Sequence, residues 1–392
     1  MARELIAAAA RGDTATLEPR LVDGADPNCK DEHGATALHR AVEGGHAQAA
    51  ACLLAYGADP EIADQDGLYP LSLSYTTVET LHAVRQQYRR FRKSTATRPT
   101  SPQVEAMATE LARNGIVKVS GWVEPQELAT MKQEFEQFAR NLEDKLGRGE
   151  ARYRHYDEEE HYWPNDRAYV CNNAFKYSRQ LIRWCCRPSL IELSNHYLGR
   201  RAMISRGVAM RYLPSAPTDH DMFGWHHDIE DQRLKIMILL TDVGEQDQAM
   251  TYVLGSHRLL HPYEMFFRNT CSLEYCRAHL PSLEIFRTTG TAGDVFLFDS
   301  NGAHRGNRRE AGEVRDVFMV EYASDRCDLW GGDISTAAFD GLRLDAGNPF
   351  EPMMSVPKKW NGAHTRSYPA WIEQLPLVES WLAPLTNGRG SA

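Results

Sequence analysis

The residues of this chain that could do chemistry stand near its middle. His226 and Asp228 form a His-x-Asp pair, His304 follows 76 positions after Asp228, and Arg315 follows 11 positions after His304. Residues i and i+2 of a strand face the same side, so His226 and Asp228 could reach one ion, with His227 pointing to the opposite face. Two histidines and one carboxylate leave coordination positions open and are typical of non-haem Fe(II) oxygenases. We therefore predict a metal site at His226, Asp228 and His304.

A second His-x-Asp triplet, His155-Tyr156-Asp157, has a different context. It lies in a polar, acidic stretch without a strand pattern, whereas Asp228 is followed by an apolar run over 234–242 that is typical of a buried strand. His304 follows another short apolar strand, and Arg315 opens a third. We therefore reject His155 as a metal ligand. The alternative for His226 and His304 is that they are hydrogen-bonded core histidines.

The catalytic region begins with helices and continues with strands. The pattern predicts helices near 103–113, 125–145 and 178–198. Short strands are expected near 203–213, 223–229, 234–242, 249–254, 285–288, 294–299 and 315–323. Many short strands separated by Gly and Asp turns favour a sandwich or a barrel.

Several of these segments also carry a family resemblance. They are 111–119, 125–128, 226–228 with the strand that follows, 252–257, and His304 with Arg315. The region from about Ser101 to the C-terminus resembles the phytanoyl-CoA dioxygenase family of Fe(II)- and 2-oxoglutarate-dependent oxygenases. The resemblance implies a double-stranded β-helix, a jelly-roll or cupin-like fold, with flanking helices.

The resemblance also implies the roles of single residues. His226, Asp228 and His304 would be the catalytic metal ligands, and Arg315 would anchor the carboxylate of 2-oxoglutarate. Many members carry a serine two residues after the distal histidine, where this chain has Gly306. We expect Tyr212 to help Arg315 bind the co-substrate. His257, in the turn 252–257, is expected to be structural.

The implied reaction consumes Fe(II)-bound 2-oxoglutarate and O₂ and yields succinate. We predict hydroxylation of a small organic molecule, in which desaturation and cyclisation remain open. Halogenation is disfavoured because halogenases of this fold lack the metal carboxylate, which is present here as Asp228. The alternatives are a protein hydroxylase that recruits its substrate through the N-terminal repeats, and a scaffold with an inactive oxygenase domain.

The first part of the chain contains an internal repeat. Gly24-Ala25-Asp26-Pro27 recurs 33 positions later as Gly57-Ala58-Asp59-Pro60, and a Thr-x-Leu-His-x-Ala segment begins at Thr36. This period and segment are the signature of ankyrin repeats, which this region resembles. We predict helical ankyrin repeats over residues 1–83, in which His39 packs the repeat and binds no metal. The copies would be Met1 to about Asn28, Cys29 to about Ala63, and a fading copy to about His82.

A basic segment rich in Ser, Thr and Pro follows over 84–102, which we interpret as a linker to an oxygenase domain over 103–392. The net charge of −9 argues against nucleic acid as the main partner. No apolar run is long enough for a membrane helix. The expected partner of the oxygenase domain is a small-molecule substrate, and the candidate partner of the repeats is a protein. Eight cysteines without a disulfide framework indicate a cytoplasmic location.

Overall fold

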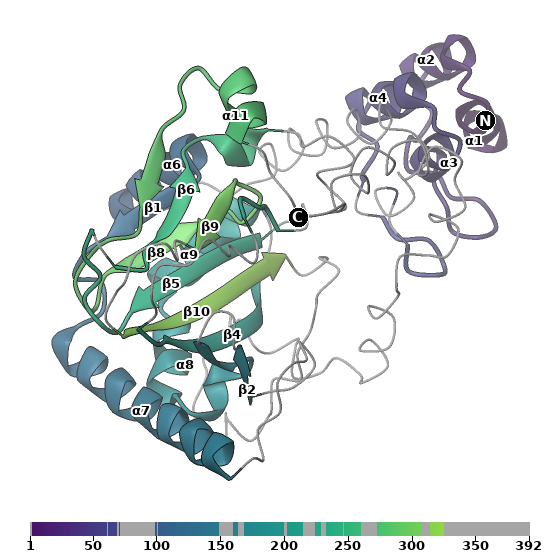
Figure 1. Cartoon of the computed structure of the whole chain (residues 1–392). Coiled ribbons are helices and arrows are strands. Elements are labelled where there is room, and N and C mark those ends of the chain that lie inside the picture. Colours follow the sequence, from purple (N-terminus) through teal and green to yellow (C-terminus); the bar gives the residue numbers. More distant parts are fainter. Residues whose placement is uncertain are drawn as a thin grey trace, which may run out of the picture. The chain divides into compact units, whose positions relative to one another are not determined.

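The computed structural model describes the chain in segments. They are residues 2–60, 62–68, 70, 99, 101–148, 160–163, 168–199, 202–214, 224–228, 233–245, 247–259, 273–306 and 314–324. The chain divides into two compact units, Met1–Ala96 with Leu260–Tyr263, and Thr97–Leu259 with Glu264–Ala392 (Figure 1). The boundary lies inside the predicted linker. None of the described helices is long and apolar enough to cross a membrane.

The first unit is built from pairs of short helices. They are α1 (Ala2–Ala10), α2 (Thr14–Val22), α3 (Ala37–Glu43) and α4 (Ala47–Ala55). Gly24 and Gly57, which are 33 positions apart in the sequence, both adopt a positive φ, 86° and 89°, after the second helix of each pair. A cluster that includes Leu5, Leu38 and Leu53 is fully buried between the helices. The ankyrin repeats are therefore present as predicted. The helices predicted for the third copy fall on residues outside the described ones.

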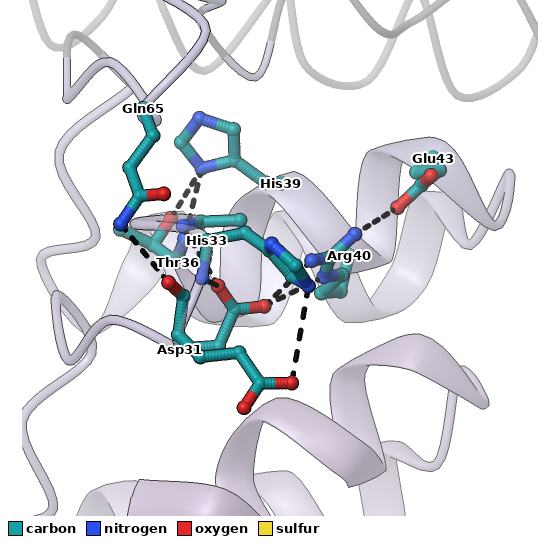
Figure 2. Close-up of polar contacts among 9 residues, drawn as sticks. Asp31, His33, Thr36, His39, Arg40, Glu43 and Gln65 are labelled. Carbon is teal, nitrogen blue, oxygen red and sulfur yellow. Dashed lines mark hydrogen bonds and ion pairs between the residues drawn. The ribbon is translucent and has the colours of Figure 1, made fainter.

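Polar contacts fix the turn that precedes α3 (Figure 2). Asp31 accepts hydrogen bonds from Arg40, Nε at 2.9 Å and Nη2 at 2.6 Å, and Arg40 also binds Glu43. The Nδ1 atom of His39 lies 3.0 Å from the backbone nitrogen of Thr36, and its Nε2 atom lies 3.0 Å from the carbonyl of Leu68. His39 is fully buried and packs the repeat, as expected.

The second unit contains two antiparallel sheets. The order of the larger one, among the described residues, is β1-β8-β5-β10-β4-β3-β2, and that of the smaller one is β7-β6-β9. The strands are β1 (Ile116–Val119), β2 (Glu160–Trp163), β3 (Ala168–Cys171), β4 (Ala202–Tyr212), β5 (Arg233–Leu239), β6 (Met250–Val253), β7 (Ile285–Arg287), β8 (Val295–Phe298), β9 (His304–Gly306) and β10 (Arg315–Ser324). This is the jelly-roll-type oxygenase domain expected from the sequence.

Helices cover one face of the larger sheet (Figure 1). They are α6 (Pro102–Asn114), α7 (Pro125–Gly147), α8 (Arg179–Cys185) and α9 (Pro188–Leu198). The described residues of this unit also form α11 (Leu273–His279) and short 3₁₀ turns at Ala174–Lys176 and Ser256–Arg258. Alternate residues of β5 divide between two cores. Leu234 and Ile236 pack with the helices, whereas Met237 and Leu239 pack with Tyr252 of the smaller sheet. The face that bears Met237 is therefore the inner face, between the sheets.

Three sequence predictions need correction. The helix expected over 178–198 is two helices, because Pro188 starts α9 and forces Arg187 into an extended conformation. The strand expected over 223–229 is, within 224–228, a single bridge at His226. Strands β2 and β3 were not predicted, because their surroundings are acidic and polar.

Candidate metal centre

The two histidines lie opposite each other. The backbone of His226 exchanges two hydrogen bonds with that of His304, at 3.0 and 2.8 Å, although the two residues are far apart in the sequence. The backbone nitrogen of Asp228 donates to the carbonyl of Ser300 at 2.8 Å. These backbone hydrogen bonds hold residues 226–228 against the end of β8 and the start of β9. The imidazole centroids are 4.3 Å apart.

The side chains of His226, Asp228 and His304 converge. Each offers one ligand atom, and these three atoms lie within 4.8 Å of one another. His227 is fully buried and is not part of this group; its Nδ1 atom lies 2.5 Å from the carbonyl of Asp228. The structure thus brings together the three residues that the spacing selected. His155 lies outside the described residues.

Carbonyl groups orient both imidazole rings. The Nδ1 atom of His226 lies 3.2 Å from the carbonyl of Gly224, and that of His304 lies 2.8 Å from the carbonyl of Gly302. A carbonyl oxygen only accepts, so each Nδ1 carries the hydrogen and each Nε2 carries the lone pair. This is the arrangement by which proteins fix the tautomer of metal-binding histidines.

The electrostatics of the site favour a neutral histidine beside a carboxylate. Burial, followed by the charge of His226, lowers the pKa of His304 to about 3, so this imidazole is neutral at pH 7. Burial alone raises the pKa of the Asp228 carboxyl, but Lys235, His304 and His226 outweigh it and hold the pKa below its usual range. The ammonium of Lys235 lies 2.5 Å from Oδ2 of Asp228. His304 and Asp228 are therefore in the protonation states that a divalent ion requires.

Two aromatic rings pack against the imidazole of His304. The rings of Tyr252 and His304 are stacked, with centroids 6.3 Å apart, and the Phe298 ring lies 5.7 Å away, edge-on. The hydroxyl of Tyr252 donates to the carbonyl of Asp299 at 2.8 Å. Gly302 makes room for this tyrosine, because a Cβ atom there would lie 1.9 Å from its hydroxyl oxygen. Sequence reasoning missed Tyr252, Phe298 and Gly302 as neighbours of the ligand.

Arg315 and Tyr212 stand opposite each other on β10 and β4. The guanidinium lies over the tyrosine ring, 4.7 Å from its centroid. Arg315 is 5% exposed; its Nη1 donates to the carbonyl of Gln248, and its Nη2 lies 3.5 Å from Sδ of Met237. Burial lowers the pKa of Arg315, and no carboxylate of the described residues forms an ion pair with it. A buried guanidinium in this state is suited to binding an anion.

His257, by contrast, has a structural place. It is 7% exposed in the turn Ser256–Arg258, and its Nε2 atom lies 3.1 Å from the carbonyl of Ala112 at the end of α6. It is not among the three convergent ligands. This agrees with the structural role expected for it.

Two family models match the chain. The model of phytanoyl-CoA dioxygenase (PhyH) matches residues 111–316, and the model of ankyrin repeats (many copies) matches residues 21–74. Among curated proteins, Ankyrin repeat-containing protein P1E11.10 of Schizosaccharomyces pombe is 38% identical over 81 residues, which are 21% of this chain. The match spans 39% of that protein's length.

Several solved structures are also similar. AviO1 from Streptomyces viridochromogenes Tue57 is 18% identical with a TM-score of 0.42, and the match covers 58% of this chain and 97% of AviO1. EctD from S. alaskensis with bound Fe is 19% identical with a TM-score of 0.45, and the match covers 58% of this chain and 77% of EctD. A third structure is the epimerase SnoN in complex with Fe3+, alpha ketoglutarate and nogalamycin RO. It is 18% identical with a TM-score of 0.42, and the match covers 62% of this chain and 92% of SnoN. TM-scores below 0.5 are too low to carry an argument about this chain.

Proposed function

The chain belongs to the phytanoyl-CoA dioxygenase family, and from this premise we propose that it is an Fe(II)- and 2-oxoglutarate-dependent oxygenase. The proposed reaction hydroxylates a small organic molecule and converts 2-oxoglutarate to succinate and CO₂. The observation that carries the proposal is the convergence of His226, Asp228 and His304 within reach of one ion, in a domain that also buries Arg315.

The donor set fits Fe(II). Two imidazoles, each with its Nδ1 held by a carbonyl and its Nε2 directed elsewhere, and one ionised carboxylate are the ligands by which non-haem Fe(II) oxygenases hold their metal. His226, Asp228 and His304 would hold the ion. The bound Fe(II), together with 2-oxoglutarate, would supply the activation of O₂. The carbonyls of Gly224 and Gly302 would keep both rings in orientation.

Arg315 fits the distal carboxylate of 2-oxoglutarate. Its Nε atom is buried and has no hydrogen-bond acceptor among the described residues, and a planar guanidinium can donate two parallel bonds to a carboxylate. Tyr212 would hold the guanidinium in place through its ring face. At Gly306, where many family members have serine, an added Cβ atom would meet nothing within 4 Å. Arg315 would therefore bind the carboxylate without a hydroxyl from that position.

The surroundings of the ligands favour a dry reaction site. Phe298 and Tyr252 are buried at the His304 ring, and Met237 lies against the Arg315 guanidinium. Excluding water strengthens the ionic contacts that position a charged co-substrate and protects reactive species from side reactions. These side chains would orient and enclose the reactants, while the metal provides the chemistry.

Turnover of 2-oxoglutarate tests the proposal. The full-length chain, loaded with Fe(II), should convert 2-oxoglutarate to succinate at a rate that rises with the true substrate, and the product of an ¹⁸O₂ reaction should gain the mass of one labelled oxygen. Asp228→Ala should abolish both signals. Fe(II)-independent succinate formation, or none with any organic substrate, would contradict the proposal. A product that loses two hydrogens would replace hydroxylation by desaturation or cyclisation.

We also propose that the ankyrin repeats bind a protein and contribute nothing to the metal site. The described part of these repeats has its own buried core, which includes Leu5, Leu38 and Leu53, and arrays of this kind present extended binding surfaces. A chain that begins at Ser101 should then turn over a small substrate at an unchanged rate. Insoluble or inactive protein would instead indicate that the repeats support the fold.

A further inference from the structure

A row of charged residues crosses the inner face of the larger sheet. In the strand register, Glu321 of β10 stands opposite Arg206 of β4 on one side and opposite Lys235 of β5 on the other. Directly opposed residues of antiparallel strands place their side chains on the same face. Lys235 alternates with Leu234 and Ile236, which pack against the helices, so the row faces the interior between the sheets. Apolar residues are the usual occupants of such positions.

The row is in contact with the candidate metal ligands. The ammonium of Lys235 lies 2.5 Å from Asp228 Oδ2 and 3.8 Å from Glu321 Oε2. Arg233, two residues before Lys235 on the same face, lies 3.3 Å from Glu321 Oε1. The side chains of Lys235, Arg233 and Glu321 are 17%, 8% and 9% exposed. Arg206 donates to the amide oxygen of Asn172.

The charges of this group do not balance. Arg206, Arg233 and Lys235 contribute three positive charges, and Asp228 and Glu321 contribute two negative ones. A divalent ion held by Asp228 competes with Lys235 for that carboxylate, and the two charges of bound 2-oxoglutarate offset those of the ion, so the excess of one positive charge remains. Burying a charge without a counter-charge is costly, so the metal-loaded site favours an additional anion next to Lys235.

The row lies away from the position of Arg315. Val317 and Met319 separate Arg315 from Glu321 on the inner face of β10, and six residues of a strand span about 20 Å between Cα atoms. The guanidinium of Arg315 extends to Met237, the inner-face neighbour of Lys235, so Arg315 and the row occupy different positions along the inner face of the larger sheet. The Arg315 position is the one proposed for 2-oxoglutarate. The row of charged residues would therefore face the molecule that is oxidised.

We propose that Lys235, with Arg206 and Arg233, binds an anionic group of the substrate, a carboxylate or a phosphate, and so directs an organic acid to the metal centre. The inference rests on the proposed function and deepens it. Lys235 is the positioning residue, because its ammonium contacts the candidate metal ligand Asp228. Glu321 would keep the three cations in place around the anion.

Binding to matched pairs of small molecules tests this inference. The full-length protein is loaded with Fe(II) and 2-oxoglutarate without oxygen and titrated calorimetrically with hexanoate against hexanamide, and with hexyl phosphate against hexanol. We expect at least one anion to bind about tenfold more tightly than its neutral partner, a difference typical of a charge-assisted contact. The pair that shows the preference distinguishes a carboxylate from a phosphate substrate.

Variants assign the preference to the row. Lys235→Met should reduce the ratio of affinities to about one, whereas Lys235→Arg, which keeps the charge, should retain most of it. Lys132→Met is the matched control, because Lys132 is exposed on α7, and it should leave the ratio unchanged. Thermal unfolding of each metal-loaded variant checks that it is folded.

Three results would overturn the inference. They are equal affinity for the charged and neutral members of both pairs, no binding of either anion, and a ratio that survives Lys235→Met. A Lys235→Met variant that instead loses affinity for 2-oxoglutarate would assign the row to the co-substrate. Failure of the proposed function is a separate result, since the wild-type protein would then not bind 2-oxoglutarate in the presence of Fe(II).

Discussion

Replacing Arg315 with leucine removes the proposed anchor of 2-oxoglutarate. A buried carboxylate that loses its only cation is destabilised by about 3–5 kcal/mol. At 1.4 kcal/mol for each factor of ten, the dissociation constant of 2-oxoglutarate should rise roughly 140- to 4,000-fold. The large effect is expected because Arg315 is 5% exposed, so water cannot replace the lost contact.

The same substitution should leave the stability of the ligand-free protein nearly unchanged. Burial disfavours the charged guanidinium, as the lowered pKa of Arg315 indicates, so leucine relieves a desolvation cost. It also removes the contact with the Tyr212 ring, which is worth about 0.5–2 kcal/mol. These effects oppose each other. Unfolding in urea should show a change of no more than about 1–2 kcal/mol.

Arg211 provides the matched control, since it lies on the neighbouring strand with its own carboxylates. It donates two hydrogen bonds to Asp316, at 2.8 and 2.7 Å, and a third to Glu136. Arg211→Leu should lower the free energy of unfolding by about 3–5 kcal/mol, because Asp316 is left buried and unpaired. Its affinity for 2-oxoglutarate should change less than about threefold, well under 1.4 kcal/mol.

The assay is calorimetric titration of the Fe(II)-loaded, oxygen-free variants with 2-oxoglutarate, accompanied by urea unfolding of the ligand-free proteins. An unchanged dissociation constant in Arg315→Leu would refute its role. So would a loss of stability as large as that of Arg211→Leu, because Arg315 would then have a structural partner.

Three further substitutions test other parts of the account. Asp228→Ala should abolish Fe(II) binding in a metal titration; retained stoichiometric binding would exclude it as a ligand. Gly306→Ser should fit and tighten 2-oxoglutarate binding by about fivefold, the value of one hydrogen bond, whereas weaker binding would place the co-substrate elsewhere. Asp294 is buried 2.9 Å from Lys118; burial raises the pKa of its carboxyl, but hydrogen bonds from Lys118 and Thr291 outweigh this and lower it. The stability that the Asp294 carboxylate contributes should be fully present above about pH 4, the pKa of unfolded Asp, and should be lost as pH falls through the lower folded pKa. The free energy of unfolding in urea of Asp294→Asn should therefore differ from that of the wild type at about pH 7 and much less at about pH 2. A difference that is independent of pH would contradict this reasoning.

The elements that could be predicted from sequence have strong local patterns. The apolar strands β5, β8 and β10 and the Pro-initiated helices α6 and α7 appear where the sequence places them. The ankyrin period likewise predicted the helix pairs. Strands β2 and β3 were not predicted, because their sequence neighbourhood is polar. Pairing with β4, which is distant in the sequence, stabilises β3 in spite of this.

The candidate ligands could be selected by residue type and spacing, whereas their surroundings could not. Lys235 stands inside a run that was interpreted as an apolar strand, and its contact with Asp228 depends on the register between strands. A local signal did exist, since Arg233 and Lys235 alternate with Leu234 and Ile236 and so share a face. The partner strand that brings Glu321 to the same face cannot be found from spacing alone.

The most direct test of the metal centre is a crystal structure of the full-length chain grown without oxygen in Fe(II) and 2-oxoglutarate, with diffraction data collected on both sides of the iron absorption edge. We expect one anomalous peak within about 2.0–2.2 Å of a nitrogen of His226, an oxygen of Asp228 and a nitrogen of His304, and a 2-oxoglutarate carboxylate on Arg315. Iron bound elsewhere, or a metal site without these three residues, would contradict the account.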